Sequence, residues 1–142
     1  LARKKPKPGK VGVGKYNGFG GGLENGETLE ECAIRETYAE AEIKILSPQK
    51  VGKIFFQFEE NEKNHLVYFF NVTYFEGTPK ESGEMEKPIW FHRDRLPYDE
   101  MWDSDRYWMP YLLRGQIFEG EMNFDLNRKV KSYNIRVVKE IK

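Results

Sequence analysis

The feature that most constrains this chain is a glycine-rich segment that runs directly into an acidic segment. Residues 17–43 read NGFGGGLENGETLEECAIRETYAEAEI, with five glycines in the first half and seven glutamates overall. On a helix, Glu36 and Glu40 share one face, where unpaired like charges would weaken the helix. Carboxylates are hard oxygen ligands suited to Mg²⁺, which keeps open positions for water and phosphates. We therefore predict that the helix holds metal, that the metal holds phosphate, and that the glycines let the loop backbone come close.

The remaining sequence predicts a mixed α/β protein with a sheet between helices. Thr28 and Glu31 form a capping-box pattern, so a helix is expected from there to about Ala41. The basic, Pro- and Gly-rich residues 1–14 predict a loop in which Arg3 and the neighbouring lysines are solvated. The other expected elements are a hairpin of residues 51–58 and 65–74, a short strand 89–91, a helix from about Ser104 to Gly115, and strands 117–124 and 130–138.

Composition narrows the function classes. The 142 residues suit one domain, and 23 basic against 23 acidic residues give no net charge that would favour nucleic acid or an acidic membrane. Cys32 has no partner for an internal disulfide, and no apolar run is long enough to cross a bilayer. We expect a cytoplasmic monomer with no membrane and no stable nucleic acid partner.

The segment resembles the signature of the Nudix hydrolases, G-x5-E-x7-R-E-U-x-E-E-x-G-U, where U is aliphatic. Six positions fall on it in register: Gly21, Glu27, Arg35, Glu36, Glu40 and Ile43. The resemblance implies a single Nudix domain over residues 1–142, with an α/β/α sandwich, a mixed central sheet and the loop and helix at its metal site. We interpret Glu27 and Arg35 as a structural ion pair that steadies the loop.

Nearly the whole chain is similar to one branch of that family, the MutT-like oxidised purine nucleoside triphosphate diphosphatases of animals. The phrases YNGFGG, KVGKIFFQF, EGTPKESGEM and MWDSDRYW carry this similarity. It implies a Mg²⁺-dependent, or alternatively Mn²⁺-dependent, hydrolase that cleaves an oxidised purine nucleoside triphosphate to monophosphate and pyrophosphate. Such an enzyme would cleanse the nucleotide pool and so serve DNA repair. The branch's first strand would be truncated or missing before Leu1.

The similarity also implies a set of site residues. The metal ligands would be the Gly20 carbonyl and the carboxylates of Glu36, Glu40 and Glu84, with these three glutamates as the catalytic groups. The substrate-binding residues would be Asn17, Phe56, Phe58, Trp102, Ser104, Asp105 and Phe124, with Asn17 and Asp105 reading the base and the aromatic rings walling its pocket. We expect Asp105 to recognise an oxidised base through its protonation state.

Several positions depart from the pattern. Thr37 replaces an aliphatic residue, Ala39 replaces a glutamate of the metal cluster, and Glu42 replaces the glycine that would most easily become left-handed after the helix. Ser104 replaces one of two neighbouring aspartates, and Gly22 stands where the branch usually has a lysine. Two alternatives therefore stay open, namely a Nudix hydrolase of another nucleotide and a catalytically weak nucleotide-binding module.

Overall fold

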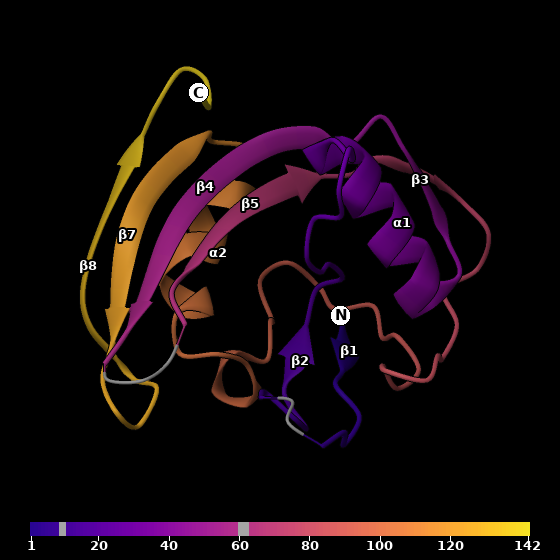
Figure 1. The fold of residues 1–142 in the computed structure, drawn as a ribbon, viewed down its shortest axis with the longest axis horizontal. Helices are drawn as coiled ribbons and strands as arrows, with labels where there is room; N and C mark the ends of the chain where they lie inside the picture. Colours follow the sequence, from indigo (N-terminus) through magenta and orange to yellow (C-terminus); the bar gives the residue numbers. More distant parts are fainter. Residues whose placement is uncertain (9–10, 60–62) are drawn as a thin grey trace. The chain divides into compact units, whose positions relative to one another are not determined.

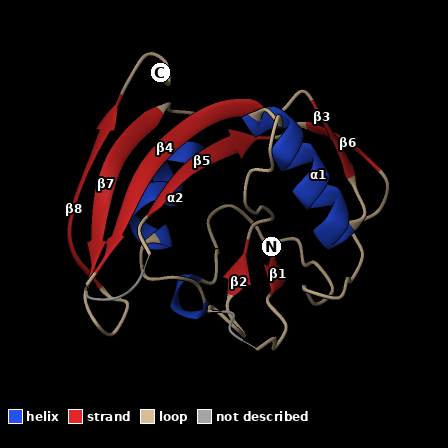
Figure 2. Cartoon of the chain, viewed as in Figure 1, coloured by secondary structure: helices blue, strands red, loops and turns tan. Residues whose placement is uncertain are grey.

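The computed structural model describes residues 1–8, 11–59 and 63–142. It contains two compact units, each built from two stretches of chain. The first unit comprises Leu1–Pro48 and Val72–Trp102, and the second comprises Gln49–Asn71 and Asp103–Lys142. Figure 1 follows the chain through them, and Figure 2 marks the helices and strands.

The first unit is organised around helix α1 (Leu29–Ala41), which confirms the predicted helix. Its end packs into a small apolar core of Ala41, Ile43 and Ile45, against which Phe19, Ala33, Ile34 and Val72 also lie. Strand β3 (Lys44–Leu46) continues from the helix and pairs antiparallel with β6 (Tyr74–Glu76). This core fixes the C-terminal half of α1, from which the predicted carboxylate ligands project.

Two expectations for the first unit are wrong. Residues 1–14 are not wholly a solvated loop, because β1 (Ala2–Arg3) pairs antiparallel with β2 (Tyr16–Asn17), and the Ala2 side chain is fully buried. The chain at 89–91 forms no strand, although the backbones of Ile89 and Leu1 exchange two hydrogen bonds. Pro88 has no N–H to extend that pairing, and Trp90 is 78% exposed. A short 3-10 turn, η1 (Tyr98–Glu100), precedes Trp102.

The second unit contains a four-stranded mixed sheet in the order β5-β4-β7-β8. The predicted hairpin is confirmed as β4 (Gln49–Phe58) and β5 (His65–Asn71), and its turn falls partly outside the described residues. The two predicted late strands are also confirmed, as β7 (Phe118–Phe124) and β8 (Val130–Val137). β4 and β7 run parallel, whereas the other neighbours are antiparallel, so the predicted mixed sheet is present.

Helix α2 (Asp105–Leu113) lies over one face of this sheet, as Figure 2 shows. The contact is aromatic: the Trp108 ring lies 4.0 Å from that of Phe69 and 6.1 Å from that of Phe118. Gly52 of β4 makes room for Phe118, because a Cβ there would lie 2.4 Å from the Phe118 ring. None of the helices among the described residues is long and apolar enough to span a membrane.

Candidate active site

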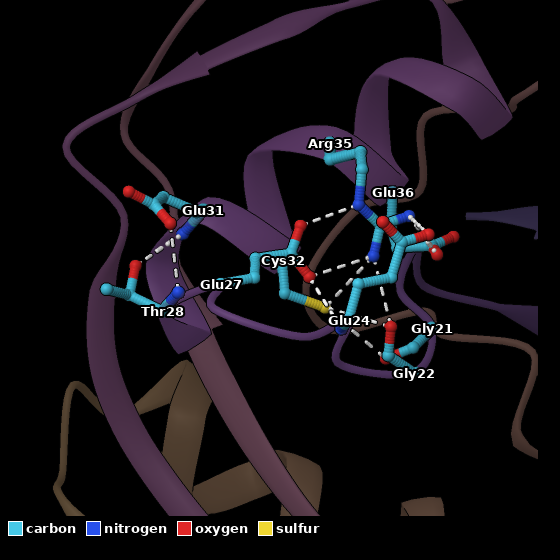
Figure 3. A network of polar contacts seen from close by, with 9 residues as sticks. All are labelled: Gly21, Gly22, Glu24, Glu27, Thr28, Glu31, Cys32, Arg35 and Glu36. Atoms are coloured by element: carbon cyan, nitrogen blue, oxygen red, sulfur yellow. Dashed lines mark hydrogen bonds and ion pairs between the residues drawn. The ribbon is translucent and has the colours of Figure 1, made fainter.

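The acidic helix begins at a complete capping box, shown at the left of Figure 3. Thr28 Oγ1 accepts a hydrogen bond from the Glu31 backbone N–H at 3.1 Å, and Glu31 Oε2 accepts one from the Thr28 N–H at 2.9 Å. These bonds satisfy N–H groups that the first turn of a helix leaves without intrahelical partners. They fix the residue at which α1 begins, and therefore the direction in which the later glutamates project.

The ion pair predicted between Arg35 and Glu27 is present and bidentate. Arg35 Nε and Nη2 donate to the two Glu27 oxygens at 2.6 and 3.0 Å, and Nη2 also donates to the Gly22 carbonyl at 3.0 Å. The Arg35 guanidinium and the Glu24 backbone N–H lower the pKa of Glu27 to about 2. These contacts join α1 to the glycine loop (Figure 3), which is the structural role expected for the pair.

Glu36 lies between Arg35 and the glycine loop. Its Oε1 accepts a hydrogen bond from Arg35 Nη1 at 2.6 Å. Its carboxyl group fills the space where a side chain of residue 21 would be, because a Cβ on Gly21 would lie 2.5 Å from Glu36 Cδ. Any larger residue at position 21 would displace the Glu36 carboxyl group, so the loop backbone lies directly against a predicted metal ligand.

Glu40 is the most deeply placed of the acidic groups, with only 7% of the residue exposed. Its Oε1 accepts a hydrogen bond from the Gly20 backbone N–H at 2.7 Å. Burial raises the pKa of Glu40 to about 7, and the charges of Glu36 and Glu84 add to that rise. The Gly20 N–H and the Lys4 ammonium act in the opposite direction. Glu40 thus lies within the electric field of both Glu36 and Glu84.

Glu84 lies on an exposed turn that is tied to the start of the chain. Its backbone carbonyl accepts a hydrogen bond from the Lys5 N–H at 2.9 Å, and its carboxylate lies 3.4 Å from Lys7 Nζ. Ser82 Oγ accepts hydrogen bonds from the backbone N–H groups of Glu84 and Met85 at 3.3 and 3.1 Å. The turn is therefore held in place, while the Glu84 carboxylate remains accessible.

The donor set suits a hard divalent cation, although the side chains are not gathered around one. Within residues 1–8, 11–59 and 63–142, no three His, Cys, Asp or Glu side chains are grouped closely enough to hold a metal ion. Glu36 is turned toward Arg35, and Glu40 toward the Gly20 N–H. The pKa of Glu40 is raised mainly by burial and further by the charges of Glu36 and Glu84, and a bound cation would offset both effects. The residues therefore fit Mg²⁺ or Mn²⁺ by chemistry and by charge.

Two of the residues expected to bind the base lie in the first unit. Asn17 ends β2, and its Nδ2 donates to the Lys15 carbonyl at 3.0 Å, which leaves its amide oxygen available as an acceptor. Trp102 is half-buried and lies under the backbone of Gly12, where a Cβ would come within 3.0 Å of the indole Nε1. One amide and one aromatic ring are thus fixed by backbone neighbours.

The other expected base-binding residues lie in the second unit, in two groups. Three phenylalanine rings stack in a row: Phe58 on Phe124 with centroids 5.0 Å apart, and Phe56 on Phe124 at 5.9 Å. Phe56 and Phe124 are buried, whereas Phe58 is partly accessible. Phe56 and Phe124 therefore pack mainly against neighbouring rings, and only Phe58 has an accessible surface that a ligand could contact.

Ser104 and Asp105 form the second group, at the start of α2. Ser104 is 3% exposed, and its hydroxyl lies 3.5 Å from Asp105 Oδ1. The same oxygen accepts a hydrogen bond from Trp108 Nε1 at 3.0 Å. Sequence reasoning missed Trp108, although its position three residues after Asp105 on a predicted helix would have indicated the contact. An indole N–H can only donate, so this Asp105 oxygen is an acceptor.

Comparison with known proteins places these features in a family. The NUDIX domain family matches residues 1–112. The chain is 39% identical over 127 residues to the oxidized purine nucleoside triphosphate hydrolase of Mus musculus, covering 89% of this chain and 81% of that protein. It is 35% identical over 130 residues to the protein of the same name from Danio rerio, covering 92% and 83%.

A solved structure shows the same fold. The MutT protein of Bacillus halodurans matches with a TM-score of 0.76, covering 94% of this chain and 87% of that one. At 22% identity this likeness bears on the fold alone, and it confirms the fold class predicted from the sequence.

Proposed function

The chain belongs to the NUDIX domain family and is a hydrolase related to the oxidized purine nucleoside triphosphate hydrolases, and on that premise we propose its reaction. It hydrolyses modified purine nucleoside triphosphates of the 8-oxo-dGTP type to the monophosphate and pyrophosphate. The reaction depends on Mg²⁺, with Mn²⁺ as a substitute. Residues 1–142 act as one Nudix domain.

One observation carries this proposal. Glu40 is a buried carboxylate that is held by the Gly20 N–H at 2.7 Å and lies in the field of Glu36 and Glu84. A buried carboxylate that lies in the field of two further negative charges is costly for a fold unless it has a use. Binding a divalent cation through Glu36, Glu40, Glu84 and the Gly20 carbonyl gives it one.

The carboxylates have two duties in the proposed reaction. When bound, the divalent cation supplies positive charge that neutralises phosphate oxygens and makes water more acidic. Water attacks a phosphorus atom in line, and the bond from that phosphorus to the bridging oxygen breaks. The two products are the nucleoside monophosphate and pyrophosphate. One proton is released, and a carboxylate near the reacting water accepts it. Glu40, which is held beside the glycine loop by the Gly20 N–H, and Glu84, which is accessible, are the two candidates for that step.

Base recognition in the proposal combines stacking and hydrogen bonds. The Trp102 indole provides a flat surface, and the free oxygen of Asn17 can accept from the base. In the second unit the Trp108 N–H holds the Asp105 carboxylate through one of its oxygens, and Ser104 replaces the second carboxylate of the related branch. A single carboxylate should accept fewer oxidised purines than a pair of acids would.

Pyrophosphate release from a panel of nucleotides tests the proposal against both alternatives. The panel contains 8-oxo-dGTP, dGTP, a methylated purine triphosphate and a dinucleotide, each with Mg²⁺ and again with the metal chelated. We expect 8-oxo-dGTP to be the best substrate and chelation to stop the reaction. A different best substrate would favour another Nudix hydrolase, and binding without turnover would favour the nucleotide-binding module that Ala39 and Glu42 left open.

A further inference from the structure

Arg3 links segments of the first unit that are far apart in the sequence. It lies in β1, opposite Tyr16 of β2 (Figure 1). Its Nη1 donates to the Gly14 carbonyl at 2.7 Å, its Nη2 forms an ion pair with Glu100, and its guanidinium carbon lies 4.1 Å from the centre of the Tyr16 ring. Only a planar guanidinium can make these contacts at once, since a lysine ammonium lacks the fork and the flat face.

The two segments joined by Arg3 meet at Trp102. Gly12, two residues before Gly14, has a φ of +77° and lies so close to the indole that a Cβ would be 3.0 Å from Nε1. Glu100 lies two residues before Trp102, in the turn η1. Arg3 therefore binds on both sides of the contact, to the loop at Gly14 and to the turn at Glu100 that leads into Trp102.

The position of Arg3 is itself well fixed. Tyr16 is 8% exposed and packs edge-on against Phe91, with centroids 5.1 Å apart. The pairing of β1 and β2 continues past Arg3, because the Lys4 N–H donates to the Lys15 carbonyl at 3.1 Å and the Lys4 carbonyl accepts from the Gly14 N–H at 2.9 Å. The Arg3 backbone and the Tyr16 ring beneath the guanidinium are therefore both held by neighbouring contacts.

The contribution of this arrangement is more to geometry than to stability. The side chains of Arg3 and Glu100 are 32% and 53% exposed, and ion pairs at such positions add little to the free energy of unfolding. Stacking on an aromatic ring, in contrast, depends strongly on how that ring is oriented. A small shift of the loop or of the indole would therefore affect binding of a base more than folding.

We propose that Arg3 is a positioning residue for base recognition: it sets the loop at Gly12 against the Trp102 indole and thereby determines how well the site separates modified from unmodified purines. This inference rests on the proposed function, in which Trp102 stacks on the base. In the proposed function Glu36, Glu40 and Glu84 hold the cation that binds the phosphates. Replacing Arg3 should therefore change KM and base selectivity rather than kcat or the Mg²⁺ requirement.

The first test observes Trp102 without any substrate. In ¹⁵N-labelled protein the three tryptophans each give one indole N–H signal, and Trp102→Phe identifies the signal of Trp102. Arg3→Gln should shift or broaden that signal, and Arg3→Lys should do so in part, since lysine keeps the charge but loses the fork. Arg136→Gln is the matched control, because Arg136 makes a comparable 3.2 Å ion pair with Glu119 in the sheet of the other unit. An unchanged Trp102 signal in Arg3→Gln would overturn the positioning role.

The second test measures base selectivity. In Arg3→Gln, and likewise in Glu100→Gln, the ratio of kcat/KM for 8-oxo-dGTP to that for dGTP should fall about three- to tenfold, the scale of an ion pair and a cation–π contact at a partly exposed site. kcat should stay within about twofold, and Arg136→Gln should keep the native ratio. Equal losses on both nucleotides, or an equal loss in Arg136→Gln, would refute the selectivity role. If the native protein turns over no nucleotide, both the proposed function and the selectivity role of Arg3 are refuted. The indole N–H signal of Trp102 still tests the positioning role, because it needs no substrate.

Discussion

Replacing Glu42 by glycine should stabilise the protein, and the structure shows why. Glu42 caps the end of α1 with φ 56° and ψ 30°, a left-handed conformation, while its N–H donates to the Tyr38 carbonyl at 2.9 Å. The turn cannot relax, because the Ala41 carbonyl accepts a hydrogen bond from the Lys80 N–H at 2.9 Å and the chain enters the buried core at Ile43. Glu42 thus occupies the left-handed conformation that a glycine at this position would most easily take.

The size of the effect follows from three opposing contributions. A left-handed residue other than glycine costs about 1–2 kcal/mol, and a negative charge at a helix C-terminus costs a further ~0.3–1 kcal/mol. Glycine loses ~0.5–1 kcal/mol through the greater freedom of the unfolded chain. Glu42→Gly should therefore raise the free energy of unfolding by about 1 kcal/mol, or Tm by about 3–4 °C for a chain of this size.

The assay is thermal and urea unfolding of Glu42→Gly beside Glu42→Ala. Alanine removes the charge but keeps the Cβ, so it isolates the dipole contribution and should yield a smaller gain than glycine. A glycine variant no more stable than the alanine variant, with equal urea m-values, would show that the left-handed backbone at residue 42 is not strained.

Three further predictions concern the acidic groups. The pKa of Glu27 is lowered to about 2, so its stabilising effect is complete above the ordinary value of 4.5 and is lost as the pH falls toward 2; Glu27→Gln should flatten the dependence of Tm on pH between 2 and 5. The pKa of Glu40 is raised to about 7, so its ionised form costs stability as the pH rises through 7; without metal, Glu40→Gln should melt above the native protein at pH 8, with the difference gone at pH 4. Ala39 is exposed on α1, and Ala39→Glu should lower the Mg²⁺ concentration for half-maximal rate at a small cost in Tm; an unchanged metal titration would show that the family's carboxylate is dispensable here.

Local signals made much of the fold predictable. The capping box at Thr28 and Glu31 marks the start of α1 in the sequence, because both partners lie within one turn. The hairpin of β4 and β5 follows from runs of aromatic and β-branched residues around a polar turn. Such elements are formed by residues that are close together in the sequence, so their patterns can be recognised without a structure.

Long-range pairing was not predictable in the same way. β1 has only two residues, which pair with β2, and the Arg3 side chain also reaches Glu100, nearly a hundred positions later. No periodicity marks so short a strand, and a run of lysines and prolines indicates a solvated loop. The expected strand at 89–91 failed for the opposite reason, because its residues favour a strand but the chain offers them no continuous partner.

In the candidate site, too, the local features were predictable from the sequence and the long-range contacts were not. The spacing of Arg35, Glu36 and Glu40 on a helix follows from the sequence, as does the ion pair with Glu27. The sequence did not reveal that Glu36 fills the space over Gly21 or that Glu40 is bonded to the Gly20 N–H, because both depend on how the loop folds back onto the helix. Those contacts determine which carboxylate is buried and hence which one has its pKa raised.

The most direct test of the central claim compares the native protein with Glu36→Gln and with Glu30→Gln. Glu30 lies in the first turn of the same helix and serves as the matched control. The substrate is 8-oxo-dGTP, and both products are quantified over a Mg²⁺ titration. The account predicts equal amounts of monophosphate and pyrophosphate from the native protein and from Glu30→Gln, no reaction when the metal is chelated, and a rate at least ~100-fold lower in Glu36→Gln, since removing one charge from the metal site weakens cation binding. A Glu36→Gln variant that keeps the native rate and metal dependence would contradict the claim that the carboxylates of α1 hold the catalytic metal.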